Sequence, residues 1–258
     1  MIADKNFVIT ESNVAEYVSY IGEWIRNFVK KANVNGVVTG HSGGVDSAVV
    51  LRLCQVAGVQ VHSIMMPYDI TKKSDSMDHA LQMANEFGFI NHIYDIKPAT
   101  DAAMIPDGSS ILVGCKIENI AMSRINLRPR ERTKYLYQYA QIHNLLVVGT
   151  GNLSERLMGY FTKWADGVSD FNPIGMLTKR EIYILAHYLK VPIIIIKKAP
   201  SAELFDGQTD EVELGMKYDQ IDDFILLGSS GDDEINQKII RRIIMTEHKR
   251  NMPPIYVG

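Results

Sequence analysis

Hydrophobic residues near the start of the chain recur every three or four positions, the spacing of one buried helix face. They are Val14, Tyr17, Val18, Ile21, Trp24, Ile25, Phe28 and Val29. A short apolar run bounded by glycines, Gly36–Gly40, follows this pattern. Because it is too short for a buried helix and ends in turn residues, it predicts a buried strand.

Strand-like and helix-like patterns then alternate along the chain. Residues 48–56, 77–87 and 178–189 predict helices, and residues 59–66, 90–96 and 145–148 predict strands. Residues 97–114 predict an irregular segment, and 118–143 a long helix that Pro129 splits or kinks. Residues 191–196 are too apolar to assign to helix or strand. The alternation predicts an α/β fold: a doubly wound, mainly parallel sheet with helices on both faces, built as one domain over residues 1–258.

Composition narrows the class of protein. The 258 residues are 46% hydrophobic, and 27 Lys and Arg against 30 Asp and Glu leave no basic excess of the kind nucleic-acid binders carry. The two cysteines, Cys54 and Cys115, match no metal or redox spacing, so we expect a reducing, cytoplasmic setting. We find neither a signal-peptide core nor an apolar run of the roughly 20 residues that span a bilayer. These features predict a globular protein with no nucleic-acid or membrane partner.

The most informative string follows the first predicted strand and opens a helix. It reads Gly40-His41-Ser42-Gly43-Gly44-Val45-Asp46-Ser47. The glycines let the backbone approach an anion closely, and the helix start directs unpaired N–H groups at the same place. Ser42 and Ser47 add hydroxyl groups. The string therefore predicts a phosphate-binding loop at the carboxyl end of a strand, where open parallel sheets bind ligands.

This loop is unlike the common nucleotide-binding loops. It has no Gly-Lys-Ser/Thr ending and no G-x-G-x-x-G pattern. Asp46 places a carboxylate beside the phosphates, and a divalent cation would have to bridge them, so Asp46 predicts Mg²⁺. The plainer alternative is an ordinary glycine-rich turn with Asp46 near a helix N-cap. The whole string resembles the pyrophosphate loop of the N-type ATP pyrophosphatases, which adenylate a substrate.

A second set of strings narrows the resemblance. Gly149-Thr150-Gly151-Asn152-Leu153-Ser154-Glu155 follows the predicted strand 145–148, and further strings lie at 159–170, 172–175, 177–179, 200–204, 207–211 and 213–215. In this order, and as far as His248-Lys249-Arg250, they are similar to the ammonia-dependent NAD synthetases. The sequence departs from the family at three places: His41, where an aliphatic residue is more usual, residues 124–132, which follow the family loosely, and the unusually apolar run Ile193–Ile196.

The resemblance implies a role for each matching residue. Asp46 and Glu155 match magnesium ligands. Gly40 to Ser47, Thr150, Lys179 and Ser201 match positions that hold ATP. Positions that hold deamido-NAD match Arg130, Lys163, Asp170, His248 and Lys249. Asp166 matches an aspartate near the reacting carboxylate, and Asp46, Asp166 and Lys179 are the expected catalytic residues.

Each of these residues has a plainer alternative. Glu155, Asp166 and Asp170 are otherwise helix caps or loop residues, and Lys179 a solvated helix start. Arg130 lies in a charged stretch that could simply face solvent, and the basic residues at 248–250 could be a plain tail.

The implied reaction is the amidation of deamido-NAD to NAD with free ammonia, through an acyl-adenylate, with release of AMP and pyrophosphate. Members of this family are typically homodimers, and residues 118–143 are long enough to supply an interface. One alternative is another adenylating ATP pyrophosphatase: a GMP synthetase core, an asparagine synthetase or a tRNA-modifying enzyme. The other is a regulator that binds ATP without turnover, against which Asp46, Glu155 and Lys179 argue.

Overall fold

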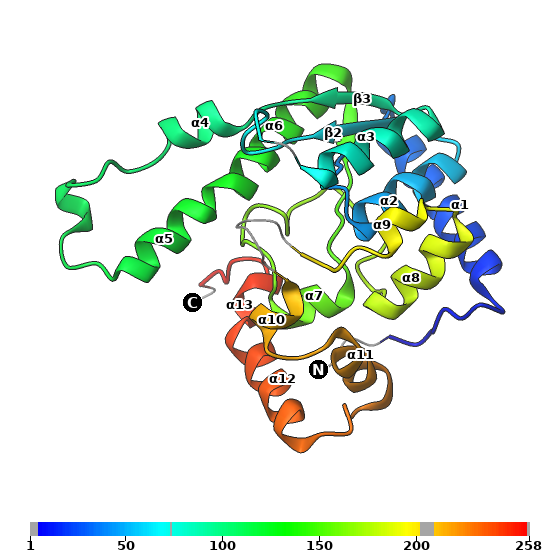
Figure 1. Cartoon of the computed structure of the whole chain (residues 1–258). Coiled ribbons are helices and arrows are strands. Elements are labelled where there is room, and N and C mark those ends of the chain that lie inside the picture. Colours follow the sequence, from blue (N-terminus) through cyan, green and yellow to red (C-terminus); the bar gives the residue numbers. More distant parts are fainter. Residues whose placement is uncertain (1–4, 73, 202–208, 257–258) are drawn as a thin grey trace.

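A parallel sheet of four strands lies at the centre of the computed structural model, which describes residues 5–72, 74–201 and 209–256 (Figure 1). The strands are β1 (Gly36–Gly40), β2 (Val61–Met65), β3 (Ile90–Ile93) and β4 (Leu145–Val147). Their spatial order is β3-β2-β1-β4, so Val37 of β1 pairs with Val61 on one side and Leu146 on the other. The winding direction reverses between β1 and β4, which makes the carboxyl ends of these two strands the switch point of the sheet.

One face of the sheet is covered by helices from both halves of the chain. They are α1 (Val14–Ala32), α2 (Val45–Val56), α3 (Asp75–Phe87), α8 (Lys179–Tyr188) and α9 (Ile193–Ile196). Their buried side chains form one core with Val37 and Val61. The predicted stripe of α1 is confirmed except at Trp24, which is 46% exposed. The eight predicted positions cover a wider strip of the helix than the core contacts, so Trp24 lies at its margin. Its ring packs edge-on against Phe171.

The other face is covered by α6 (Leu127–His143), whose Tyr139 and Ala140 pack with Val38, Ile64 and Val147. Helices therefore cover both faces, and the predicted doubly wound sheet is confirmed. Two further helices, α4 (Lys97–Ala102) and α5 (Ile117–Ile125), extend away from the sheet and contact α6 (Figure 1).

A third group of helices follows β4 and builds a separate small core. The core is built by α7 (Leu153–Met158), α10 (Asp210–Leu214), α11 (Tyr218–Leu227) and α12 (Asp233–Met245). The short helix α13 (Glu247–Arg250) follows α12 and contributes no buried residue. Met158, Ile221 and Ile239 are fully buried in this core. Because α7 also follows β4, this group closes around the same sheet edge that carries the switch point.

Three local predictions are resolved by proline positions. The segment 97–114, predicted as irregular, contains α4 and a 3₁₀ turn at Ser110–Leu112. Pro98 is compatible with α4 because it lies in the first helical turn, where no N–H has a partner within the helix. The helix expected at 118–143 is split, with the break at Asn126 and Pro129 in the first turn of α6. Residues 193–196 form the short helix α9, with Pro192 at its N-cap.

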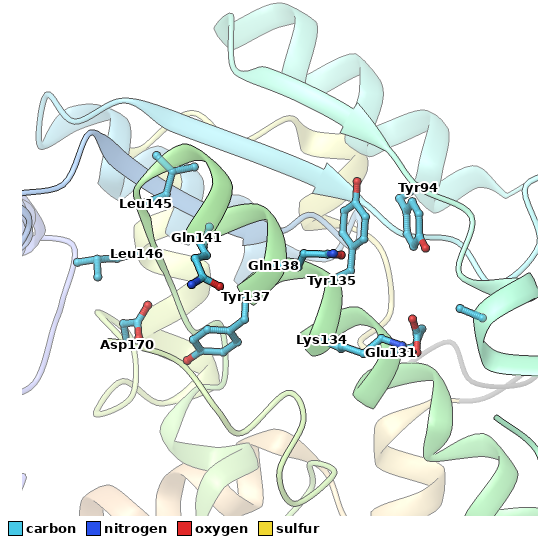
Figure 2. Close-up of a pocket in the computed structure, with 12 residues that line it drawn as sticks. Tyr94, Glu131, Lys134, Tyr135, Tyr137, Gln138, Gln141, Leu145, Leu146 and Asp170 are labelled. Carbon is cyan, nitrogen blue, oxygen red and sulfur yellow. Dashed lines mark ion pairs between the residues drawn. The ribbon is translucent and has the colours of Figure 1, made fainter. Parts of the chain in front are cut away.

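An open groove of about 840 Å³ runs along α6 (Figure 2). Tyr94 and Tyr135 stack in it with ring centroids 3.7 Å apart. Its other labelled residues are Glu131, Lys134, Tyr137, Gln138, Gln141, Leu145, Leu146 and Asp170. Among the described residues, no helix is long and apolar enough to cross a membrane.

Candidate active site

The glycine-rich string forms a tight turn between β1 and α2. Gly43 has φ +78°, and a Cβ atom there would lie 2.1 Å from the carbonyl oxygen of Ser76, so this position requires glycine. Gly44 is the N-cap of α2, and no described side chain caps this helix. The first N–H groups of α2 are therefore available to an anion. Ser42 and Ser47 line the turn, with their hydroxyl oxygens 3.2 Å apart.

His41 points away from this turn into the molecule. Its side chain is buried, and Nδ1 lies 3.1 Å from the hydroxyl oxygen of Ser63 on β2. Burial lowers the pKa of His41 to about 4, so the imidazole is neutral at pH 7. Nε2 has no hydrogen-bond partner in the described part of the chain. His41 therefore occupies a position suited to an aliphatic side chain.

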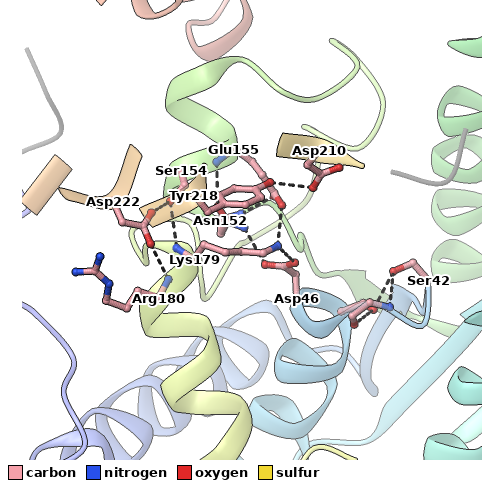
Figure 3. A network of polar contacts seen from close by, with 12 residues as sticks. Ser42, Asp46, Asn152, Ser154, Glu155, Lys179, Arg180, Asp210, Tyr218 and Asp222 are labelled. Atoms are coloured by element: carbon pink, nitrogen blue, oxygen red, sulfur yellow. Dashed lines mark hydrogen bonds and ion pairs between the residues drawn. The ribbon is translucent and has the colours of Figure 1, made fainter. Parts of the chain in front are cut away.

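Three charged side chains meet where α2, α7 and α8 begin (Figure 3). Lys179 Nζ lies 2.5 Å from Asp46 Oδ2 and 3.3 Å from Glu155 Oε1. The lysine side chain is 3% exposed and each carboxylate 17%. Asp46 follows β1 and Glu155 follows β4, so the predicted carboxylates meet at the switch point. The alternative of a solvated Lys179 is wrong.

Burial and mutual repulsion both act on this trio. Burial would lower the pKa of Lys179, but the charges of Asp46 and Glu155 outweigh it and raise the pKa above its ordinary value. The pKa of Glu155 is raised by burial and by Asp46, which together outweigh Lys179. The single positive charge of Lys179 therefore cannot balance the negative charges of both Asp46 and Glu155.

The donor set suits Mg²⁺, which prefers oxygen ligands. Asp46 and Glu155 supply carboxylate oxygens, and a cation would relieve the repulsion that raises the pKa of Glu155. The described residues contain no group of three or more His, Cys, Asp or Glu side chains arranged to hold a metal ion. Phosphate oxygens and water would therefore have to complete the coordination shell.

Asn152 is a site residue that the sequence prediction missed. Its Nδ2 donates to Asp46 Oδ1 at 2.8 Å, and its Oδ1 accepts from the backbone N–H of Glu155 at 2.9 Å. Asn152 caps α7, and the Glu155 carboxylate accepts from the backbone N–H of Asn152 at 3.2 Å. The signal was present in the sequence, because Asn-x-x-Glu before an apolar helix is the pattern of a capping box.

Tyr218 and Asp210 lie beside Lys179. Asp210 belongs to the string at 207–211, which was matched to the family without a role for this residue, and Tyr218 lies outside these strings. The Tyr218 ring centroid lies 5.0 Å from Lys179 Nζ, and its hydroxyl donates to Asp210 Oδ2 at 2.9 Å. Asp210 is buried, which raises its pKa. Both residues reach the site through the folding of α10 and α11 against α7 and α8.

Most residues matched to deamido-NAD positions form a second cluster. Lys163 Nζ lies 3.3 Å from His248 Nδ1, and Lys249 Nζ donates to the carbonyl oxygens of Gly159 and Phe161 at 2.8 Å each. The chain end is thereby joined to the 159–164 segment.

Arg130 lies in α6, and among the described residues it is linked to the same segment only through Asn126. It donates to the carbonyl oxygen of Asn126 at 3.4 Å, and the Asn126 side chain accepts from the Thr162 hydroxyl at 2.7 Å.

Asp170 departs from this cluster. Its Oδ2 accepts from the backbone N–H of Val147 at 2.7 Å, and it lines the α6 groove beside Tyr137 (Figure 2). Burial, followed by the charge and hydrogen bond of Asp170, raises the pKa of Tyr137 to about 12. Through these contacts Asp170, a loop residue, supports the end of β4.

Three predicted positions remain: Asp166, Thr150 and Ser201. Asp166 accepts from the backbone N–H of Thr162 at 2.9 Å, and desolvation raises its pKa against the opposing charges of Arg132 and Lys249. Thr150 is half-buried just after β4. Ser201 is half-buried, and the predicted strings at 202–208 lie outside the described residues.

Known proteins are similar to this chain over nearly its whole length. The family model described as NAD synthase matches residues 17–253. The NH(3)-dependent NAD(+) synthetase of Wolinella succinogenes is 37% identical over 262 residues, which cover 96% of this chain and 97% of the relative. Its counterpart from Archaeoglobus fulgidus is 38% identical over 248 residues, which cover 94% and 97%.

Two solved structures have the same fold. An NMN synthetase from Francisella tularensis superposes with a TM-score of 0.87 at 32% identity, covering 97% of this chain and 100% of that one. An NH3-dependent NAD synthetase from Campylobacter jejuni superposes with a TM-score of 0.75 at 29% identity, covering 96% and 100%.

Proposed function

This chain belongs to the NAD synthase family of ligases, and we propose that it forms NAD from deamido-NAD (the nicotinate dinucleotide), ATP and free ammonia. The observation that carries this proposal is the buried Lys179 between Asp46 and Glu155, directly beside the uncapped start of α2. The arrangement offers N–H groups, an ammonium and two carboxylates to one triphosphate.

The first step activates the nicotinate carboxylate, because its oxygen is a poor leaving group. A carboxylate oxygen attacks the α-phosphorus of ATP, the bond to the β-phosphate bridging oxygen breaks, and pyrophosphate leaves with that electron pair. The acyl-adenylate remains. The turn from Gly40 to Ser47 holds the departing pyrophosphate, with Thr150 and Ser201 as further ATP contacts, and Lys179 stabilises the developing negative charge.

Asp46 and Glu155 are the residues that would hold Mg²⁺. When bound, the ion neutralises charge on the phosphates. Asn152 and Lys179 keep the Asp46 carboxylate in place through its two oxygens, at 2.8 and 2.5 Å.

The second step transfers ammonia to the acyl carbon and releases AMP. Asp166 attracts ammonium and takes up its proton, a general-base role that the raised pKa of its carboxyl group supports. Arg130, Lys163, His248 and Lys249 bind the phosphates of deamido-NAD. The resemblance adds Asp170, although its contacts with Val147 and Tyr137 favour a supporting role.

A mononucleotide is the second candidate acceptor. The superposition on the Francisella tularensis NMN synthetase, with a TM-score of 0.87, favours it. The chemistry would be unchanged, with nicotinate mononucleotide in place of the dinucleotide. The two acceptors differ only in the adenosine monophosphate half of the dinucleotide, so the acceptor depends on whether the protein binds that half.

We further propose that residues 1–258 form a single domain, and that the protein acts in the cytoplasm as a homodimer. The groove along α6 supports an interface between two copies, because tyrosine and glutamine side chains line it beside the exposed end of the helix.

The test is to incubate the purified protein with ATP, Mg²⁺, ammonium and either deamido-NAD or nicotinate mononucleotide. Chromatography then quantifies NAD, NMN and AMP. We expect NAD and AMP in equal amounts from deamido-NAD. A higher kcat/KM with the mononucleotide would identify the second candidate as the function. AMP without either amide would indicate a sibling ATP pyrophosphatase, and no product would indicate an ATP-binding regulator.

A further inference from the structure

A buried carboxylate outside the trio joins the two helix starts that carry Glu155 and Lys179. Asp222 lies in α11 and is 1% exposed. Its Oδ1 accepts from the Ser154 hydroxyl at 2.5 Å, and its Oδ2 accepts from the backbone N–H of Arg180 at 2.7 Å (Figure 3). One side chain thus contacts the first turns of both α7 and α8.

The two bonded residues are sequence neighbours of the site residues. Ser154 directly precedes Glu155, and its hydroxyl oxygen accepts from the backbone N–H of Lys179 at 3.1 Å. Arg180 directly follows Lys179. Asp222 is therefore one hydrogen bond from the backbone of α8 and two from Lys179 itself.

This arrangement accounts for the first N–H groups of α8, which have no partner within the helix. Thr178 Oγ1 accepts from the third N–H, of Glu181, at 3.5 Å. Ser154 accepts from the first, and Asp222 from the second. Without Asp222 and Ser154 the start of α8 would carry two buried, unpaired donors.

A carboxylate suits this position better than an amide. Both partners of Asp222 donate, and a carboxylate accepts at both oxygens, whereas an asparagine would present an NH₂ group to one of them. The mismatch would displace either Ser154 or the start of α8. Since the Lys179 ammonium lies 2.5 Å from Asp46, a small shift of α8 changes that contact directly.

We propose that Asp222 is a positioning residue of the ATP site: it holds the starts of α7 and α8 so that Glu155 and Lys179 face Asp46. The inference rests on the proposed function, because it takes these three residues as the site that binds Mg–ATP. Asp222 acts through Ser154 and the α8 backbone and does not touch the substrates.

The test compares Asp222→Asn with Asp223→Asn. Asp223 lies beside it on α11 but contacts the Arg180 guanidinium at the surface, at 2.9 Å. For Asp222→Asn we expect kcat to fall about tenfold or more and the half-saturating ATP and Mg²⁺ concentrations to rise several-fold, because misplaced charges stabilise the transition state poorly. For Asp223→Asn we expect all three values within about twofold of the parent, as for other exposed ion pairs.

Ser154→Ala tests independently whether Asp222 acts through Ser154. It removes the link to the Lys179 N–H but leaves Asp222 bonded to Arg180. We expect a smaller loss in the same direction, and Asp222→Asn should add less in this background than it does alone. If Asp222→Asn fails to fold, Ser154→Ala alone decides.

Calorimetric binding of Mg–ATP to each variant separates this inference from the proposed function, since that measurement needs no acceptor substrate. We expect weaker Mg–ATP binding by Asp222→Asn whichever acceptor the enzyme uses. Variants that melt at lower temperature but keep the parent kcat, half-saturation values and Mg–ATP affinity below their Tm would overturn the proposal. A purely structural Asp222 would give that result.

Discussion

At the scale of single residues, the site depends on the imbalance between two carboxylates and one ammonium. Lys179 bonds both Asp46 and Glu155, and the raised pKa of Glu155, caused by burial and by Asp46, reflects the remaining repulsion. A site with this imbalance favours a bound cation. Removing one carboxylate should therefore change how turnover depends on Mg²⁺, while the other carboxylate still pairs with Lys179.

Asp46→Asn tests that consequence. We expect Mg²⁺-dependent turnover to fall roughly 100-fold or more, because a ligand and a charge in the transition state are lost. The fold should survive, since Glu155 still pairs with Lys179. Steady-state kinetics at several Mg²⁺ concentrations measure the effect. Asp233→Asn, at an exposed position in the first turn of α12, is the matched control. Unchanged turnover in Asp46→Asn would remove Asp46 from the metal site.

His41 predicts a pH dependence of stability. Burial lowers its pKa to about 4 in the folded chain, while the unfolded value is about 6.5, so the unfolded state binds more protons between these values. Stability from this residue is present above pH 6.5 and is lost as pH falls towards 4. The free energy of unfolding should fall by about 2 kcal/mol from this group between pH 7 and pH 5.

Urea unfolding of the parent and of His41→Leu at both pH values checks this prediction. The leucine variant should lack that part of the fall in stability. Equal falls in the two proteins would mean that the imidazole is not held neutral.

At the scale of elements, the helix starts both stabilise the fold and place the site. Asn152 caps α7 and holds Asp46, whereas Asp232 caps α12 far along the chain by accepting from the N–H groups of Glu234 and Ile235. The two caps are comparable locally, but only one touches the site. Replacing each by alanine therefore separates stability from function.

Asn152→Ala and Asp232→Ala should each lower the free energy of unfolding by about 1 kcal/mol, the usual effect of losing an N-cap. Only Asn152→Ala should also raise the KM for ATP and lower kcat, since it frees the Asp46 carboxylate. Urea unfolding and steady-state kinetics on both variants make the comparison. Equal activity in the two variants would show that the bond from Asn152 to Asp46 plays no part in catalysis.

At the scale of the whole molecule, the exposed side of α6 predicts self-association. Ile142 is 71% exposed near the end of α6, next to the groove residue Gln141. An apolar side chain beside an aromatic groove is typical of an interface core. Light scattering after size-exclusion chromatography should give twice the mass of one chain.

Ile142→Glu should shift that mass towards the monomer, because an unpaired charge would be buried at the contact. Leu227→Glu is the matched control: Leu227 is 77% exposed at the end of α11, away from the groove. A monomeric parent, or an equal effect of both substitutions, would rule out α6 as the contact.

Much of the fold was predictable because its signals are local. Gly36–Gly40, the turn after it and the helix that follows are set by short apolar runs and by glycines, and the structure confirms all three. The approximate ends of β2 and β4 follow for the same reason, whereas β3, expected at 90–96, ends at Ile93. Pro129 indicated that the helix 118–143 is split but not that the break falls at Asn126, because proline is compatible with any position in a first helical turn.

The sequence by itself determined the local chemistry: a glycine turn before a helix, a carboxylate within it, and a second acidic helix start after β4. Only the tertiary structure decided which groups meet. It placed Lys179 between Asp46 and Glu155, and bonded Asp170 to the end of β4. Such contacts depend on how distant helix starts converge at one edge of the sheet. That convergence is set by packing across the whole core, and no short stretch of sequence encodes it.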